Sequence, residues 1–415
     1  MADPKADQGL RRTRDLAHDV AELTPDVVAL RRLLHQHPEL AFEEVQTAAT
    51  LAARMRAIGL AVHERIGGTG VVAVLEGTRA GPTLLVRADM DALAMTETTG
   101  RAYASTLANR HHACGHDAHA AVVAGVAAVL ARHRDRLAGR VTFVFQPADE
   151  PMRGARRMIE DGLLERARPD LSMSLHVLPM LNAGHVVIQR GPIWASWDTR
   201  TLRIGGPAPA VDEPTPFDIA RLAARLTAAL YDLVDREGQT AEPVSFRVRR
   251  LTAEQPGGSD PSQAAVEVHM GRGGPPHGVL EINLALYDNA LRSRLLGGIE
   301  AEARTIVEAA GGTFRIDVDY ALPAVVNDDH VTAALDRAAR RVVGESNIVT
   351  GWRNRFADDI GLFLAAAPGC LMLLGTGNPS KDITEVWQRP GFDIDEDALP
   401  VAVHIMAMAA LDVLR

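Results

Sequence analysis

Apolar segments of strand length alternate with segments of helical periodicity through the first half of the chain. Thr24 followed by Pro25 predicts a helix start near the N-terminus. The valine-rich segments Gly70–Leu75 and Thr83–Val86 predict buried strands, and apolar residues at helical spacing follow over Asp117–His133. This alternation is typical of a largely parallel sheet with helices on both faces and functional loops at the strand ends. The sequence therefore predicts a three-layer α/β/α domain.

The middle of the chain has a different pattern, which predicts a separate α+β unit. Ser196–Ile204 has strand character, Ala290–Ala310 is helical, and a loop rich in glycine, proline and serine spans Glu254–Ser262. Strand and helix patterns of the first kind return toward the C-terminus. We therefore predict a catalytic domain in two parts, at residues 1–195 and 320–415, with an inserted α+β domain carrying an open-faced sheet at residues 196–319.

Composition argues against several classes of partner and location. The 415 residues carry a formal net charge of −9 and no basic tract, which argues against nucleic acid or an anionic membrane surface as a partner. The two cysteines, Cys114 and Cys370, cannot form a disulfide framework, so we expect a reducing, cytoplasmic location. The polar N-terminus lacks the apolar core of a signal peptide, and the longest apolar run, Ala120–Ala131, is too short to span a bilayer.

Residues 111–119 carry four histidines, a cysteine and an aspartate. Thiolate and imidazole are good zinc donors, and the spacing of Cys114 and His116 presents both from one loop. Gly115 between them allows the backbone to turn tightly. The alternative interpretation is a surface histidine cluster followed by a buried helix.

Three further motifs place polar side chains at the ends of predicted strands. The adjacent carboxylates Asp149 and Glu150 could divide metal binding and proton transfer between them. His176 ends an apolar strand, and Asp89 follows another. Taken singly, the acidic residues are also typical of solvated turns, and His176 of a core or capping histidine. Because the strands belong to one predicted sheet, we expect the motifs to converge in one cleft.

Four segments together resemble the aminoacylase/carboxypeptidase family of two-metal amidohydrolases. They are His37-Pro38-Glu39, the segment Arg87–Leu93, His112–Asp117 and Gln146–Glu150. Within that family the chain is most similar to the branch of hippurate hydrolases and plant auxin–amino-acid conjugate hydrolases. The resemblance implies a zinc-peptidase catalytic domain with an inserted lid and dimerisation domain. It also implies a homodimer, for which Leu280–Leu286 is a candidate edge strand.

The resemblance also implies a role for each matching residue. The metal ligands would be a bridging Cys114 thiolate, His116 and His176 on one metal, and Glu150 on the other. The metal would be Zn²⁺, or alternatively Mn²⁺, Co²⁺ or Ni²⁺. Asp149 matches the general base that takes a proton from the water attacking the amide carbonyl. Asp89 matches the carboxylate that orients a metal ligand through a hydrogen bond without binding the metal itself.

Four positions depart from the family pattern. Asp149 stands in place of glutamate, Gly205-Gly206-Pro207 in place of Gly-Gly-His, Ala285 in place of a substrate-binding arginine, and Gln388 in place of a metal-binding histidine. Amide oxygen is a poor zinc donor beside imidazole, so we expect one tightly bound metal and a weak second site. The losses in the inserted domain leave the substrate-binding residues unknown and predict an altered specificity.

Three kinds of function therefore stand side by side. The first is a metal-dependent amidohydrolase that cleaves a small N-acyl amino acid or a related compound. The second is a non-hydrolytic enzyme on the same scaffold, using one metal for condensation, cyclisation or elimination. The third is a non-catalytic partner subunit. A cysteine hydrolase using Cys114 with His176 is a remaining alternative, which insensitivity to chelators would reveal.

Overall fold

The computed structural model describes residues 4–207, 217–239, 243–254 and 275–415, and therefore omits most of the predicted loop Glu254–Ser262. The chain forms two compact units. The first comprises residues 1–193, 326–353 and 358–415, and the second comprises residues 194–325 with 354–357. In the sequence, the second unit is thus an insertion within the first. Its ends lie at residues 194 and 325, compared with 196 and 319 in the predicted domain division.

An eight-stranded mixed sheet forms the centre of the first unit. In spatial order its strands are β1 (Ala61–Ile66), β2 (Gly70–Glu76), β4 (Ala138–Gln146), β3 (Arg79–Asp89), β5 (Leu171–Asn182), β14 (Gly369–Gly377), β6 (Val186–Val187) and β13 (Ile348–Val349). β3 runs parallel to both β4 and β5, and β5 runs parallel to β14. The carboxyl ends of these central strands therefore meet at one edge of the sheet, where ligand sites of α/β folds form. A separate two-stranded sheet pairs β7 (Gly191–Trp194) with β12 (Val325–Asn327).

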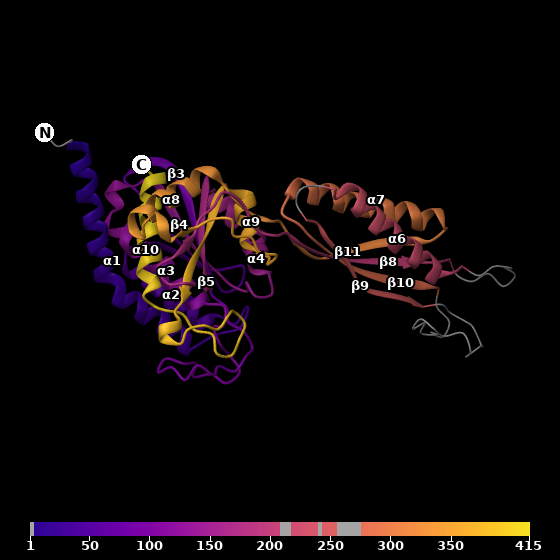
Figure 1. Ribbon diagram of the computed structural model, residues 1–415, viewed down its shortest axis with the longest axis horizontal. Helices are drawn as coiled ribbons and strands as arrows, with labels where there is room; N and C mark the ends of the chain where they lie inside the picture. The colour runs from indigo at the N-terminus through magenta and orange to yellow at the C-terminus, as the bar shows by residue number, and fades with distance from the viewer. Residues whose placement is uncertain (1–3, 208–216, 240–242, 255–274) are drawn as a thin grey trace. The chain divides into compact units, whose positions relative to one another are not determined.

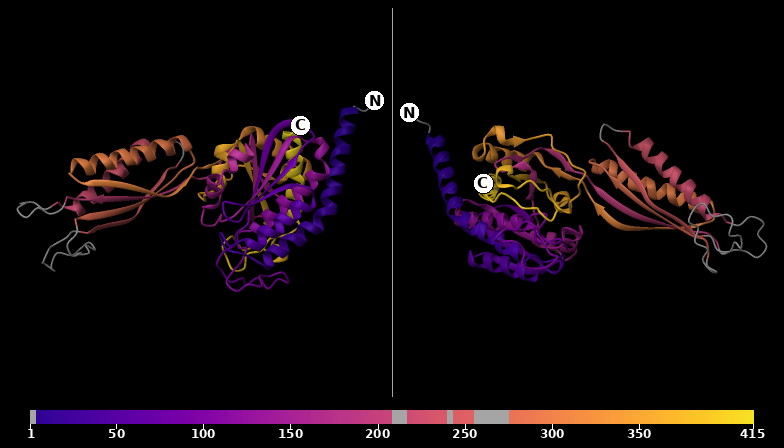
Figure 2. Two further views of the ribbon diagram at one scale, coloured as in Figure 1. Left: turned by 180° about the vertical axis from the view of Figure 1, so that it is seen from behind. Right: turned by 60° about the horizontal axis from the view of Figure 1, so that its bottom comes forward.

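Helices cover both faces of this sheet (Figure 1). One layer contains α1 (Pro4–Gln36), α2 (Val45–Ala57), α3 (His116–Arg132), α8 (Asp329–Val342) and α10 (Ala398–Val413). The other contains α4 (Gly154–Glu160), α5 (Leu163–Ala167) and α9 (Ile360–Ala366). The further views show α1 along the outer side of its layer (Figure 2). The predicted three-layer α/β/α architecture is confirmed. None of the helices in the described ranges is long and apolar enough to cross a membrane.

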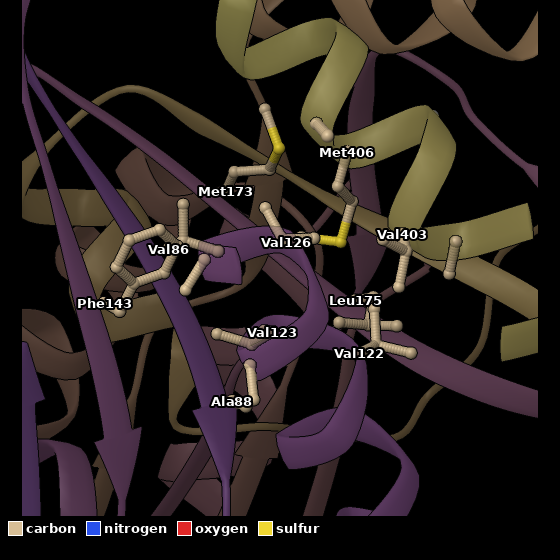
Figure 3. Close-up of a cluster of buried hydrophobic side chains, with 14 of the residues drawn as sticks. Val86, Ala88, Val122, Val123, Val126, Phe143, Met173, Leu175, Val403 and Met406 are labelled. Atoms are coloured by element: carbon tan, nitrogen blue, oxygen red, sulfur yellow. The ribbon is translucent and has the colours of Figure 1, made fainter. Parts of the chain in front are cut away.

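The core of the first unit lies between the sheet and the layer containing α3 and α10 (Figure 3). Val86, Phe143 and Leu175 from the strands meet Val122 of α3 and Met406 of α10, and all five are fully buried. Burying a side chain of this size contributes about 1.5–3 kcal/mol.

The helices of this layer pack closely at Gly125 in α3. A Cβ atom there would lie 2.8 Å from Val27 in α1 and 3.0 Å from Val403 in α10, so a larger side chain would force the helices apart. This packing holds α3 in place, and α3 begins at His116.

The second unit has a four-stranded antiparallel sheet in the order β11 (Thr313–Leu322), β8 (Trp197–Gly205), β10 (His277–Ala285) and β9 (Ser245–Glu254). Helices α6 (Ile219–Glu237) and α7 (Asn289–Ala309) pack on one face of it (Figure 1). The predicted open-faced sheet is therefore confirmed. The predicted edge strand Leu280–Leu286 is wrong, because β10 pairs with β8 on one side and with β9 on the other. Among the described strands, β9 and β11 are the outer ones.

The predicted helix start at Thr24 is also wrong. Helix α1 continues through Pro25 to Gln36. The Thr24 hydroxyl donates a 2.8 Å hydrogen bond to the carbonyl of Val20, one turn earlier, and so does not cap a helix N-terminus. Packing against α3 and α10 stabilises α1 as one continuous helix, although Thr24-Pro25 is a local pattern typical of a helix boundary.

Candidate metal centre

The predicted site residues come from neighbouring elements at the carboxyl edge of the central sheet. β3 ends in Asp89, the turn after β4 carries Asp149 and Glu150, and β5 carries His176. Because β4 and β5 both lie beside β3, these side chains come close together although they are far apart in sequence. The loop before α3 adds Cys114, so all the motifs meet in one place.

Three strong metal donors form the centre of this group. The side-chain donor atoms of Cys114, His116 and His176 all lie within 4.8 Å of one another. The Cys114 Sγ atom is 3.7 Å from His176 Nε2. Gly115 between the first two has φ of +86°, and a Cβ there would lie 2.6 Å from Val177. Only glycine fits this turn, which presents a thiol and an imidazole from one loop.

His116 is held so that one ring nitrogen faces the centre. Its Nδ1 donates a 2.8 Å hydrogen bond to the backbone carbonyl of Asp91. Its Nε2 has no hydrogen-bond partner among the described residues, and neither has Glu150 Oε1, 3.9 Å away. Asp149 Oδ2 lies 3.7 Å from the same nitrogen. Buried polar atoms without partners are rare, and a nitrogen, a thiol and carboxylate oxygens arranged in this way fit a divalent metal ion.

His176 faces the same centre as a neutral imidazole. Burial, together with the nearby His119, lowers the pKa of His176 to about 3. Its Nδ1 donates a 2.8 Å hydrogen bond to the Val177 carbonyl, which leaves the Nε2 lone pair toward Cys114. The indole of Trp387 meets the His176 ring edge-on at 5.4 Å between ring centroids. Hydrogen bonding of one nitrogen fixes the tautomer that a metal ligand requires.

Asp89 contacts a histidine that was not among the predicted ligands. Its Oδ1 accepts a 2.7 Å hydrogen bond from His119 Nδ1, and His119 Nε2 in turn accepts one of 2.9 Å from the Val177 amide. Asp89 therefore orients His119, which supports the strand segment next to His176. Asp89 Oδ2 also lies 3.9 Å from His116 Nε2.

Sequence reasoning missed Asp91, which holds the acidic turn in place. Its two carboxylate oxygens accept hydrogen bonds of 3.0 Å from the backbone amides of Asp149 and Glu150. Ala148, just before them, has φ of +50°, a conformation that costs energy for a residue with a side chain. The signal for Asp91 was present in the segment Arg87–Leu93, whose second carboxylate had no assigned role.

Sequence reasoning also missed the cluster around Arg87, whose guanidinium is fully buried. Arg87 pairs with Asp89 at 2.7 Å, with Asp359 at 3.1 Å, and with Asp149 through a short contact. Although burial acts in the opposite direction, Arg87 keeps the pKa of Asp149 below its usual value. Burial and the charge of Asp149 raise the pKa of Asp358 to about 8. The predicted general base is thus an ionised carboxylate with Oδ1 on Arg87 and Oδ2 toward the metal ligands.

The four departures from the family pattern lie in different parts of the chain. Gln388 lies at the centre, where its amide Nε2 is 3.3 Å from Glu150 Oε2. It has φ of +57°. Its side chain therefore faces the predicted ligand of the second metal instead of pointing away. Ala285 ends β10, and Pro207 follows β8, both in the second unit.

Metal binding at this centre is expected to strengthen as the pH rises. Burial raises the pKa of Glu150 to about 7. Although burial opposes it, the carboxylate of Asp89 raises the pKa of His116 well above its usual value. Both groups are protonated below these values and must lose their protons to bind a cation. The tight ligand Cys114 must also lose a proton, and burial raises the pKa of its thiol well above its usual value. We therefore expect the apparent affinity for zinc to fall about tenfold or more for each unit by which the pH is lowered, above pH 7 as well as below it, measured by competition with a chromogenic chelator. A pH-independent affinity would contradict this donor set.

Comparison with known proteins places these features in a family. A model of peptidase family M20/M25/M40 matches residues 85–412. A protein of Synechocystis sp. named as a probable hydrolase is 33% identical over 94% of this chain and 95% of its own length. An N-acetylcysteine deacetylase of Bacillus subtilis is 30% identical over 94% of this chain and 97% of its own length. The YXEP protein of Bacillus subtilis, described as a dinuclear metal binding peptidase, superposes with a TM-score of 0.74 at 28% identity, covering 95% of this chain and 99% of that one.

Proposed function

This chain belongs to peptidase family M20/M25/M40 and is a metal-dependent amidohydrolase, and from that premise we propose its metal, its catalytic residues and its substrate class. The metal is zinc, bound tightly at one position by Cys114, His116 and His176. The substrate is a small N-acyl amino acid or a related amide. The observation that carries the proposal is the convergence of these three donors beside Asp149 and Glu150, with His116 Nε2 and Glu150 Oε1 facing inward without partners among the described residues.

The side chains around the centre divide the remaining chemistry between them. A zinc ion held there would supply positive charge to polarise the amide carbonyl. Asp149 Oδ2 accepts the proton of the attacking water, while Arg87 holds Oδ1 and so fixes the direction in which the carboxylate points. Arg87 thereby positions an aspartate that is one methylene shorter than the family's glutamate. Asp89 supports the ligand His176 through His119.

The substrate class rests on the relatives and on the changes in the second unit. The Bacillus subtilis relative is named for the deacetylation of an N-acetyl amino acid. The second unit has Pro207 and Ala285 where a histidine and an arginine were expected, and neither can donate a side-chain hydrogen bond. We therefore propose an altered specificity, with less dependence on a free substrate carboxylate than the family pattern implies.

The proposal also includes location and assembly. The thiols of Cys114 and Cys370 are not joined, which supports a cytoplasmic location. We propose a homodimer that forms through an outer strand of the four-stranded sheet, β9 or β11, because an open sheet edge is a template for pairing. Light scattering on the purified protein tests this assembly.

The function is tested by incubating the purified, zinc-loaded protein with a panel of N-acyl amino acids and following release of the free amine. Cys114→Ala is expected to remove the metal of this centre and to lower kcat/KM by at least about 10²-fold, because the thiolate is one of three strong ligands. Cys370→Ala is the matched control, because it removes a cysteine that is buried in β14. This variant is expected to keep its metal content and turnover near wild type. Hydrolysis that survives both Cys114→Ala and chelator treatment would contradict a metal centre here.

Gln388→His tests the proposed weak second position. With Gln388 at this place, the second metal has only Cys114 and Glu150 as strong donors, and a two-donor site competes poorly with water. The histidine is expected to raise bound zinc by about one ion per chain in elemental analysis. Gln46→His on exposed surface is the control. If wild type binds two more zinc ions per chain than Cys114→Ala does, the second position is filled without a histidine.

A further inference from the structure

A second group of metal-type donors lies in the first unit apart from the proposed catalytic ligands. It consists of His35 from α1, Glu97 from the segment after β3, and His111 from the loop that leads to Cys114. One donor atom from each side chain lies within 4.8 Å of the other two. The side chains of both histidines are fully buried, and that of Glu97 is 3% exposed. We propose that these three residues bind a structural zinc ion that anchors the catalytic loop.

The spacing of the donors fits a metal better than direct hydrogen bonds. His35 Nε2 lies 3.3 Å from Glu97 Oε1, and His111 Nδ1 lies 3.4 Å from Glu97 Oε2. Both separations exceed the 2.7–3.2 Å typical of N–H···O hydrogen bonds. Zinc bound at about 2.0–2.1 Å to nitrogen and oxygen in tetrahedral geometry places neighbouring donors roughly 3.4 Å apart.

His111 supplies an independent observation. Its imidazole has no exposed surface, and neither ring nitrogen has a hydrogen-bond partner of normal geometry among the described residues. Its backbone is fixed by a pair of 3.0 Å hydrogen bonds with Leu93, so the ring cannot easily turn to a different partner. A buried imidazole without hydrogen bonds is uncommon, whereas a metal ion would satisfy it directly.

The other two donors are held in the orientation that a metal ligand needs. Asp117 Oδ2 accepts a 2.7 Å hydrogen bond from His35 Nδ1, so Nε2 is the ring nitrogen that faces Glu97, at 3.3 Å from its Oε1. A carboxylate, a histidine and a metal in line is the usual arrangement around a zinc-binding histidine. Glu97 is fixed by the Ser105 amide at 2.7 Å and by a short contact from the Thr99 hydroxyl.

The local charge also leaves room for a cation. Arg31, beside His35, already pairs with three carboxylates, at 2.8 Å to Asp117, 2.9 Å to Asp393 and 3.3 Å to Glu396. Its positive charge is therefore compensated without Glu97, and the Glu97 carboxylate is left facing the two imidazoles. Two imidazoles and one carboxylate form a donor set that zinc commonly accepts.

The ion would join three segments that are separate in sequence. His111 precedes Cys114 by three residues. Between them, the backbone carbonyl of Ala113 accepts a 2.9 Å hydrogen bond from the backbone amide of Gln388. Zinc bound to His35, Glu97 and His111 would thus hold the base of the loop that presents the metal-binding thiolate of Cys114. Such an ion contributes to folding and does not take part in turnover.

The test removes the catalytic centre and asks whether zinc remains. The full chain carrying Cys114→Ala and His176→Ala is purified without chelator, and its zinc is measured by elemental analysis after dialysis. We expect about one zinc ion per chain to remain, and adding His111→Leu to bring the content close to zero. His63→Leu, at an exposed position on β1, is the control for the third substitution. Circular dichroism establishes that each variant is folded.

Cobalt substitution identifies the site independently of zinc content. Cobalt bound to the double variant is expected to give visible bands without thiolate charge-transfer absorption, and His111→Leu is expected to abolish them. A folded double variant that holds neither zinc nor cobalt would overturn the proposal, showing that a proton between His35 and Glu97 takes the place of a metal. Equal zinc in the double and triple variants would also overturn it. Neither result affects the catalytic centre, which is tested separately by Cys114→Ala.

Discussion

Asp149→Asn is expected to lower kcat/KM by about 10²–10⁴ while leaving the bound zinc in place. The substitution preserves the shape of the side chain but removes its capacity to accept a proton. Asp149 is the carboxylate whose Oδ2 faces His116 Nε2 at 3.7 Å without being one of the proposed tight ligands. Steady-state hydrolysis of the best N-acyl amino acid, with zinc measured on the same preparation, tests the expectation.

Two variants separate loss of the base from loss of structure. Asp149→Glu restores a carboxylate with the chain length usual in the family, so it is expected to keep turnover within about tenfold of wild type. Asp135→Asn, at an exposed position before β4, is the control for removing one negative charge. If Asp149→Asn retains more than about a tenth of wild-type kcat/KM, another group moves the proton.

The sequence predicted the architecture, and it indicated candidate metal donors, because both leave local patterns. Cys114 and His116 are two residues apart in a glycine-containing loop, and this spacing together with the neighbouring motifs indicates a metal site. The strands that carry Asp89 and His176 are apolar and alternate with helices, and this pattern predicts a parallel sheet whose ends meet. The convergence of these residues therefore followed from the periodicity of the chain together with the resemblance.

The contacts that hold the site in place could not be predicted in the same way. Asp359 contacts Arg87, the Gln146 side chain and the Ala155 amide, yet it is separated from Arg87 by most of the chain, including the inserted unit. Neither hydrophobic periodicity nor the spacing of a sequence motif links residues as far apart as Arg87 and Asp359. The position of β10 in its sheet depends likewise on pairing with β8, from which α6 and β9 separate it in the sequence, so strand character alone did not show which strand lies at the edge.

Arg87→Met is expected to lower the free energy of unfolding of the metal-free protein by about 3–5 kcal/mol, because removing one partner leaves the others as buried charges without compensation. Without the guanidinium, Asp149 loses the main positive charge that favours its ionised form, and Asp89, whose ionised form His116 and His119 also favour, loses part of that charge, so in the variant both pKa values rise. In wild type the same pKa values lie below those of the unfolded chain, so this stability is present near pH 7 and is lost as the pH falls through the folded values.

The difference between Arg87→Met and wild type is therefore expected to be largest near neutral pH and to narrow as the pH falls toward about 4, where the carboxylates of the variant can protonate. Urea denaturation of chelator-treated proteins, followed by far-UV circular dichroism at several pH values, measures it. Arg132→Met is the matched control, since Arg132 pairs with Asp19 and Glu22 but has a side chain 37% exposed to solvent. Exposed pairs contribute about 0–1 kcal/mol, so a similar loss in both variants would show that the buried cluster has no special role in stability.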